Sequence, residues 1–106
     1  MSSLGDAYVN FIYSLALSKN YGRPVGRKLN SSAPSIAVHK SGLRKLLPRR
    51  VDKHKQADAA EALTVYGWLS GAISIRESID IMARERDLTD NLTTLIRTIL
   101  ERSKIS

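Results

Sequence analysis

The stretch ADAAEALTVYGWL, residues 57–69, decides the fold class of this chain. It is rich in alanine and leucine and low in polarity on most sides of a helical projection, which is typical of a central helix rather than a surface helix. Shortly after it, Ser74 and Glu77 have the spacing of a capping box, and apolar residues follow at helical spacing as far as position 83. The sequence therefore predicts a central helix over residues 57–69, followed by an amphipathic helix that begins after Ser74.

The flanking segments also follow helical periodicity. A first amphipathic helix is expected over about residues 4–18, and a last helix is expected to begin with Thr89 as its cap. The apolar positions that define the first of these helices are Leu4, Ala7, Tyr8, Phe11, Ile12 and Leu15. All three prolines and three of the six glycines fall between about residues 20 and 54, so only short helices are expected there. Few segments alternate with period two, and the sequence therefore predicts an all-α fold with one compact domain over residues 1–106.

Length and composition exclude several classes of protein. With 106 residues, a mass of 11.8 kDa and 42% hydrophobic residues, the chain fits one domain with a genuine core. The chain has no cysteine, which excludes a disulfide scaffold, a thiolate zinc site and a cysteine nucleophile. No apolar run reaches the roughly 18 residues that span a bilayer, and the N-terminus lacks the layout of a secretory signal. We therefore expect a cytoplasmic protein with no membrane partner. Five aromatic side chains at helical spacing are expected in the core rather than as platforms for base stacking: Tyr8, Phe11, Tyr13, Tyr66 and Trp68.

The net charge of +7 is concentrated in one part of the chain. Residues 19–55 hold eleven lysines and arginines and one acid, Asp52, whereas residues 57–106 hold six bases and eight acids. Such a basic block favours a surface that faces a nucleic acid, with a membrane surface or a merely solvated loop as the alternatives. Within it, residues 22–28 combine glycines with bases and predict either a flexible loop that contacts phosphates or a plain turn. The candidate phosphate-contacting residues are Arg23, Arg27, Lys28, Arg44, Lys45, Arg49, Arg50, Lys53 and Lys55.

Three acidic residues lie where buried helix faces are expected. Asp6 is near the start of the first helix, and Asp58 and Glu61 are flanked by small apolar residues and share one helix face at positions i and i+3. Their mutual repulsion needs an offset if water is excluded, and a hard divalent cation such as Mg²⁺ supplies one. The alternative is that these acids only cap helices or favour their N-terminal turns. His54, one turn before Asp58, faces the acidic residues or makes a hydrogen bond within a loop.

Two motifs resemble the nuclease domain of the ribonuclease III family. Residues 4–12, LGDAYVNFI, resemble the signature helix of that family. Residues 57–63, ADAAEAL, followed by residues 66–71, resemble its second motif, Ala-Asp-x-x-Glu-Ala-hydrophobic. The two motifs occur in the family's order, separated by a basic, glycine-containing segment, and the resemblance covers about residues 3–71. By size the chain is similar to short archaeal ribonuclease III-like proteins and to Mini-III nucleases, which lack a double-stranded-RNA-binding domain.

The resemblance implies an all-helical, homodimeric endoribonuclease that hydrolyses double-stranded or structured RNA with Mg²⁺, for which Mn²⁺ can substitute. Its products would carry 5′-phosphate and 3′-hydroxyl ends. It assigns metal binding, and with it catalysis, to Asp6, Asp58 and Glu61. Two family positions differ in this chain. Ser2 stands where longer members have a glutamate one helical turn before the aspartate, and Ser3 replaces an aromatic residue of the dimer contact.

Two other functions stay open on the sequence alone. The missing glutamate favours a catalytically silent, RNA-binding relative with the same fold, such as a ribosome-associated protein, although retention of the three acids counts against it. A basic protein that bridges RNA or partner proteins without metal is the third possibility. For a dimer, the apolar helix over residues 57–71 is the candidate interface, with Gly67 and Gly71 allowing close approach.

Overall fold

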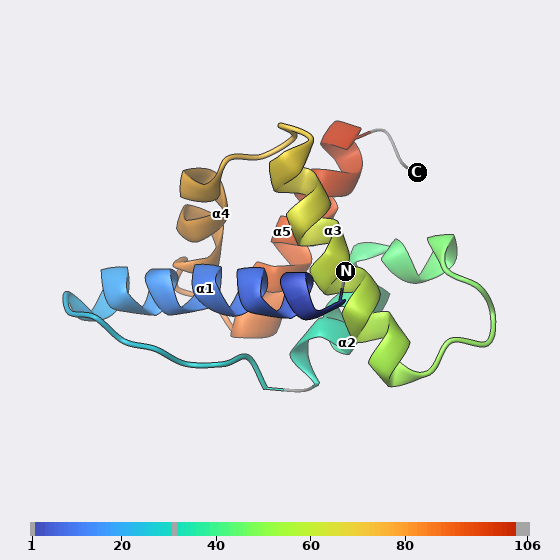
Figure 1. Cartoon of the computed structure of the whole chain (residues 1–106), viewed down its shortest axis with the longest axis horizontal. Coiled ribbons are helices and arrows are strands. Elements are labelled where there is room, and N and C mark those ends of the chain that lie inside the picture. The colour runs from blue at the N-terminus through green and yellow to red at the C-terminus, as the bar shows by residue number, and fades with distance from the viewer. Residues whose placement is uncertain (1, 31, 104–106) are drawn as a thin grey trace.

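The computed structural model describes residues 2–30 and 32–103, which form helices joined by loops and turns (Figure 1). In chain order the elements are α1 (Ser2–Tyr21), α2 (Ala33–Ser41), the 3-10 helix η1 (Leu43–Leu46), α3 (Lys53–Leu69), α4 (Ile75–Met82) and α5 (Leu88–Ser103). These residues contain no β-strand, which confirms the predicted all-α fold class. Over the same residues, none of the helices combines the length and apolar character needed to cross a bilayer.

Helices α1 and α3 make the most extensive contact in the molecule, and α2 packs on both α3 and α5. Figure 1 shows α1 lying across the molecule, with α3 crossing it near its N-terminal end and α4 beside its C-terminal half. The core lies between α5 and the other helices, where Leu92, Leu95, Ile96 and Ile99 are at most 1% exposed. This packing places the N-terminal halves of α1 and α3 side by side.

Local sequence signals explain where the helices begin and end. The carboxylate of Asp52 accepts the backbone amide of Lys55, so α3 begins at Lys53, four residues earlier than the apolar pattern indicates. The Oγ of Ser74 accepts the amide of Glu77, which confirms the predicted cap of α4. The predicted cap of α5 was wrong, because that helix begins at Leu88 rather than after Thr89.

The buried face of α1 differs from the predicted one. Val9 and Ile12 are almost fully buried, as expected for a helix packed between α3 and α4, but Leu4 and Phe11 are 50% and 53% exposed. Trp68 on α3 is also 39% exposed. The expectation that the aromatic residues all lie in the core was therefore wrong. Periodicity identifies the apolar side of a helix but does not say which part of a wide apolar face is covered.

Gly67 has a different role from the predicted one. A methyl group on Gly67 would lie 2.7 Å from the Cδ1 atom of Ile99, so the glycine admits α5 rather than a second copy of the chain. Gly71 has a φ of 80° in the turn after α3, a conformation that favours glycine. The helix over residues 57–71 is therefore largely used within the protomer.

Candidate functional site

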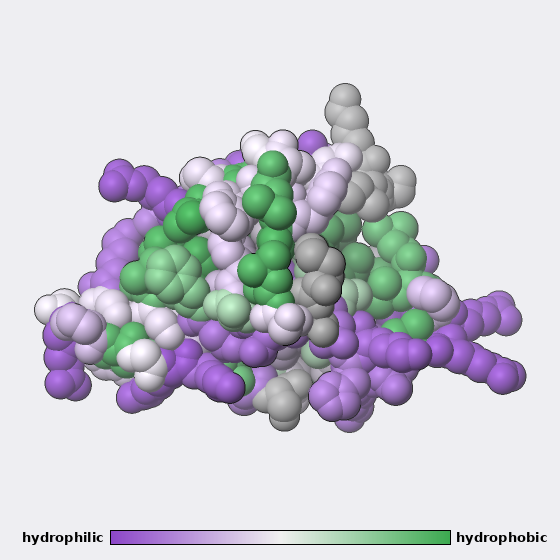
Figure 2. Space-filling model, viewed as in Figure 1, coloured by the Kyte–Doolittle hydropathy of each residue, from purple (hydrophilic) through white to green (hydrophobic). Residues whose placement is uncertain are grey.

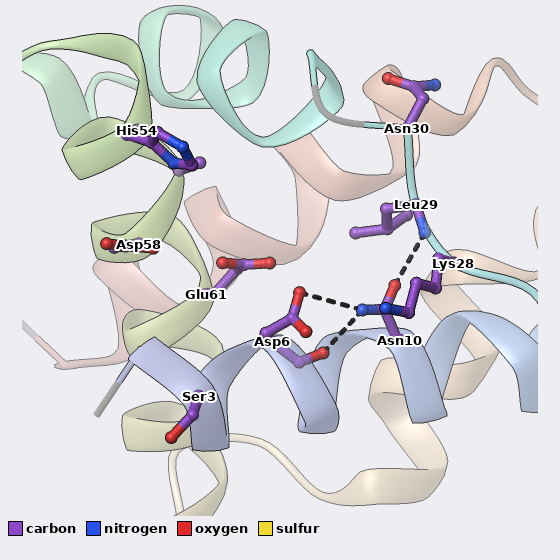
Figure 3. A pocket seen from close by; sticks show the side chains of 10 residues that line it. Ser3, Asp6, Asn10, Lys28, Leu29, Asn30, His54, Asp58 and Glu61 are labelled. Carbon is purple, nitrogen blue, oxygen red and sulfur yellow. Dashed lines mark hydrogen bonds between the residues drawn. The ribbon is translucent and has the colours of Figure 1, made fainter.

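An open hollow of about 350 Å³ lies between the N-terminal halves of α1 and α3 and the segment that leads into α2 (Figure 3). It contains all three acidic residues that the sequence singled out. The residues that line it are Ser3, Asp6, Asn10, Lys28, Leu29, Asn30, His54, Ala57, Asp58 and Glu61. The positions from the two sequence motifs therefore meet at one place on the surface.

Gly5 allows α1 and α3, the helices that carry the three acidic residues, to pack closely. A Cβ atom on Gly5 would lie 2.9 Å from the backbone carbonyl carbon of Glu61 and 3.0 Å from the backbone nitrogen of Ala62. Real Cβ atoms do not approach backbone so closely, and backbone cannot rotate aside as a side chain can. Only glycine therefore allows α1 to touch α3 at this level, and that contact places Asp6, the next residue, opposite Glu61.

The carboxyl groups of Asp6 and Glu61 point toward each other and lie close together in the hollow, whereas the carboxylate of Asp58 lies apart on α3 (Figure 3). Glu61 is only 8% exposed. Burial, the negative charges of Asp6 and Asp58, and a hydrogen bond with Asp6 together raise the pKa of Glu61 to about 7. The ion pairs between described residues join Lys19 to Asp80, Lys40 to Asp90 and Arg102 to Glu77, and none involves the three acids of the hollow.

The donor set fits a hard divalent cation in its chemistry. It consists of carboxylate oxygens without a basic partner, and Mg²⁺ takes a few carboxylates and keeps several waters. Burial raises the pKa of Glu61 first, and the negative charges of Asp6 and Asp58, which a cation would offset, raise it further. In residues 2–30 and 32–103, no three His, Asp or Glu side chains are already arranged to hold a metal. A site built from all three acids therefore needs the carboxylate of Asp58 to turn toward the other two.

Asn10, one helical turn after Asp6, was not singled out by the sequence. Its Nδ2 donates to the backbone oxygen of Asp6 at 2.9 Å and to the Oδ1 of the Asp6 carboxylate at 3.1 Å. Its Oδ1 accepts the backbone amide of Leu29 at 2.7 Å. The spacing of i and i+4 on one helix was the available signal, but the contact with Leu29 depends on the fold.

The basic residues lie on both sides of the hollow. Lys28 lines it from the segment after α1, and His54 lines it from the first turn of α3, so the site-facing interpretation of His54 is supported (Figure 3). Lys53 and His54 also line a neighbouring hollow with Ser32 and Ser35.

The seven other candidate phosphate-contacting bases are placed differently. The guanidinium of Arg44 donates to the backbone oxygens of Pro48 and Arg49, so it braces its own loop. Lys45 lines a separate hollow against α5. The guanidinium of Arg27 lies 6.0 Å from the centre of the Tyr21 ring. Arg23, Arg49, Arg50 and Lys55 are exposed. The block is therefore not one continuous patch, because helix packing turns its members to different sides.

Family position Ser2 is part of α1, but its side chain lies outside what the structure describes. Ser3, the other substituted family position, is exposed and lines the hollow.

Fold and site together define the class: an all-helical domain in which two acidic helix segments meet beside basic residues. The family model described as Ribonuclease III matches residues 1–104. The chain therefore belongs to the ribonuclease III family, as its two motifs indicate, and family membership supports a ribonuclease function in general. A search of curated proteins found no match.

Proposed function

We propose that this protein is an Mg²⁺-dependent endoribonuclease that cuts double-stranded or structured RNA and leaves 5′-phosphate and 3′-hydroxyl ends. The observation that carries the proposal is that Asp6, Asp58 and Glu61, which come from both family motifs, line one hollow without a basic partner. A protein that only binds a polyanion gains nothing from three carboxylates around one hollow, because they repel phosphates. The arrangement makes sense when a cation lies between the acids and the phosphate.

In this proposal each group around the hollow has a distinct task. Asp6 and Glu61 hold the cation from facing helices, and Asp58 completes the set after its side chain turns. A bound Mg²⁺ supplies Lewis acidity toward the phosphate and lowers the pKa of its water. Lys28, at the edge of the hollow, contributes positive charge toward the RNA backbone. Mn²⁺ can take the same all-oxygen site.

The exposed basic residues beyond the hollow contribute to RNA binding. Arg23 and Arg27 lie on the segment after α1, and Arg49, Arg50, Lys53 and Lys55 lie around the start of α3. RNA duplexes are recognised largely through phosphates and 2′-hydroxyls, so basic residues on two sides of an acidic hollow suit a duplex. Lys45 and Arg44 are weaker candidates for RNA binding, because Lys45 lies toward α5 and the guanidinium of Arg44 is hydrogen-bonded to its own loop.

A cleavage assay with charge-neutral, isosteric variants tests the proposed reaction. A long end-labelled RNA duplex is incubated with Mg²⁺ or with EDTA, using the wild type, Asp6→Asn, Glu61→Gln and the matched control Glu101→Gln on the exposed side of α5. We expect cleavage by the wild type and the control, loss of at least about 100-fold in the two site variants, and retained duplex binding. The 5′ ends of the products should accept label only after phosphatase treatment.

Binding of the duplex without cleavage in Mg²⁺ or Mn²⁺ would contradict the enzymatic proposal and favour the silent RNA-binding relative. Equal cleavage by Glu61→Gln and the wild type would contradict the assignment of the site.

We also propose a homodimer, because one hollow per protomer can cut one strand and a two-fold pair can cut both strands of a duplex. The surface we propose for it is the exposed apolar stripe formed by Leu4, Phe11 and Trp68, not the Gly67 face. Tyr8, a buried residue between Leu4 and Phe11 on α1, stacks on Trp68 with ring centroids 5.2 Å apart and so joins the α1 part of the stripe to α3. Figure 2 shows hydrophobic residues gathered in the middle of the face seen in Figure 1, above a hydrophilic lower edge.

Sedimentation of the wild type and Phe11→Ser tests the dimer. We expect the wild type to sediment as a dimer at micromolar concentration and Phe11→Ser to shift toward the monomer. Ile36→Ser, at an exposed apolar position on α2, is the matched control and should leave the dimer intact. A wild type that stays monomeric would contradict the proposal.

A further inference from the structure

A segment of extended chain, residues 23–30, lies along α1, and we call it the strap. The sequence predicted a flexible loop or a plain turn here, but three α1 side chains bind the strap backbone. They are Asn10, Ser14 and Ser18, at positions i, i+4 and i+8 of the helix. Figure 1 shows the chain after α1 turning back and running along that helix toward α2.

The contacts alternate along the strap. The Oγ of Ser18 accepts the amide of Val25 at 2.8 Å, and the Oγ of Ser14 accepts the amide of Arg27 at 3.0 Å and donates to its carbonyl oxygen at 2.9 Å. The Oδ1 of Asn10 accepts the amide of Leu29 at 2.7 Å. The strap is therefore bound at every second residue, and it runs antiparallel to α1.

The spacing of the three contacts along α1 matches their spacing along the strap. Four residues of an α-helix rise about 6 Å, and two residues of extended chain rise about 6.6 Å. Three contacts in a row therefore form without distortion, and they set the register of the strap against the helix. Lys28 lies between two bound residues, and it lines the hollow that contains Asp6. Of the ion pairs between described residues, none uses its ammonium group.

Asn10 differs from the two serines because it also binds the acidic site. Its Nδ2 donates to both the backbone oxygen and the carboxylate of Asp6, while its Oδ1 binds the strap next to Lys28. One amide group therefore connects a proposed metal ligand to the residue beside a proposed phosphate contact. Groups that orient metal ligands from outside typically change metal affinity or activity by about 10–100-fold when they are removed.

We propose that Asn10 is a positioning residue that holds the Asp6 carboxylate and the strap backbone next to Lys28 in a fixed relation, so that the carboxylate and the Lys28 side chain act on the same phosphodiester group of the RNA. The inference rests on the proposed function and deepens it. Ser14 and Ser18 hold the rest of the strap in register and do not contact the acids.

Asn10→Asp separates the two halves of this role. An aspartate keeps an oxygen that accepts the amide of Leu29, but it cannot donate to Asp6. Asn10→Ala loses both contacts, and Ser14→Ala loses a strap contact without touching the acids. Thr98→Ala on α5, whose hydroxyl donates to the carbonyl oxygen of Thr94, is the matched control for loss of a hydrogen bond within a helix.

Three readouts are measured: exchange of individual backbone amides with deuterium, Mn²⁺ affinity without RNA, and kcat and KM for the duplex. We expect faster exchange at Leu29 in Asn10→Ala but not in Asn10→Asp. We expect both Asn10 variants to lose about 10-fold or more in kcat and to change Mn²⁺ affinity. Ser14→Ala should speed exchange at Arg27 and act mainly on KM, and Thr98→Ala should resemble the wild type in every readout.

The proposal is overturned if Asn10→Asp keeps the wild-type kcat and Mn²⁺ affinity, or if Ser14→Ala matches Asn10→Ala in all three readouts. The first two readouts need no RNA and no turnover. A wild type that fails to cut RNA would therefore defeat the proposed function, while exchange at Leu29 and Mn²⁺ affinity would still decide the role of Asn10.

Discussion

Replacing Glu61 with glutamine should stabilise the metal-free protein above neutral pH, although Glu61 is assigned to the proposed active site. The pKa of Glu61 is raised from 4.5 to about 7, first by burial and then by the charges of Asp6 and Asp58. Between these two values the folded state keeps a proton that the unfolded state has lost. The free energy of unfolding therefore falls as the pH rises from about 4.5 to about 7, and it changes little from this source above that range.

The size of the effect follows from the same two values. A pKa of 4.5 in the unfolded state and of about 7 in the folded state lowers the free energy of unfolding at high pH by about 3 kcal/mol at most. The hollow is open to water, which screens the repulsion, so we take about 1 kcal/mol as the expected loss. For a domain of this size that loss lowers Tm by about 4–8 °C.

Thermal unfolding in EDTA, measured at several values between about pH 5 and pH 8, checks this expectation. The Tm of the wild type should fall across the range, and that of Glu61→Gln should stay nearly level after subtraction of the trend seen in Glu101→Gln. At the upper end Glu61→Gln should be the more stable protein. Addition of Mg²⁺ there should raise the Tm of the wild type more than that of Glu61→Gln, because the cation offsets the repulsion. Parallel pH profiles for the wild type and Glu61→Gln would refute the reasoning.

Two further predictions concern packing and RNA binding. Gly67→Ala should lower the free energy of unfolding by about 1–3 kcal/mol in urea denaturation, because the new methyl group would lie 2.7 Å from the Cδ1 of Ile99. The control is Gly26→Ala, whose new methyl group would meet no atom within 4 Å. Equal stability of the two variants would contradict the packing argument. Replacing Arg49 and Arg50 together by alanine should weaken duplex binding and reduce the slope of log K against log salt by about 0.7–0.9 per lost phosphate contact. An unchanged slope would remove this pair from the RNA surface.

The fold class was predictable from local patterns, whereas the meeting of the two motifs was expected from the resemblance to the ribonuclease III family. The spacing of Ser74 and Glu77 indicates where α4 begins, and the apolar pattern of α3 is visible over several turns. The acids of the hollow were found because carboxylates among small apolar residues are unusual. The start of α3 was missed because its N-cap residue, Asp52, lies in a segment rich in charged residues and does not stand out among them.

Other features depend on contacts between distant positions and could not be read from local patterns. The exposure of Phe11 depends on where α3 and α4 lie against α1. The use of Gly67 within the protomer depends on Ile99, far along the chain. Asn10 is an ordinary polar residue on a helix until the strap returns to bind it. Periodicity describes one helix at a time, and these features belong to pairs of segments.

The contact at Gly5 makes the acidic pair a reporter of folding. Positions 6 and 61 approach only because the backbone of α1 contacts the backbone of α3. Fraying of the first turns of α1 would separate Glu61 from Asp6 and lower the pKa of Glu61 toward its ordinary value. The ionisation of one carboxyl group can thus be followed as a probe of local opening at the N-terminus, in a chain whose single tryptophan lies elsewhere, toward the end of α3.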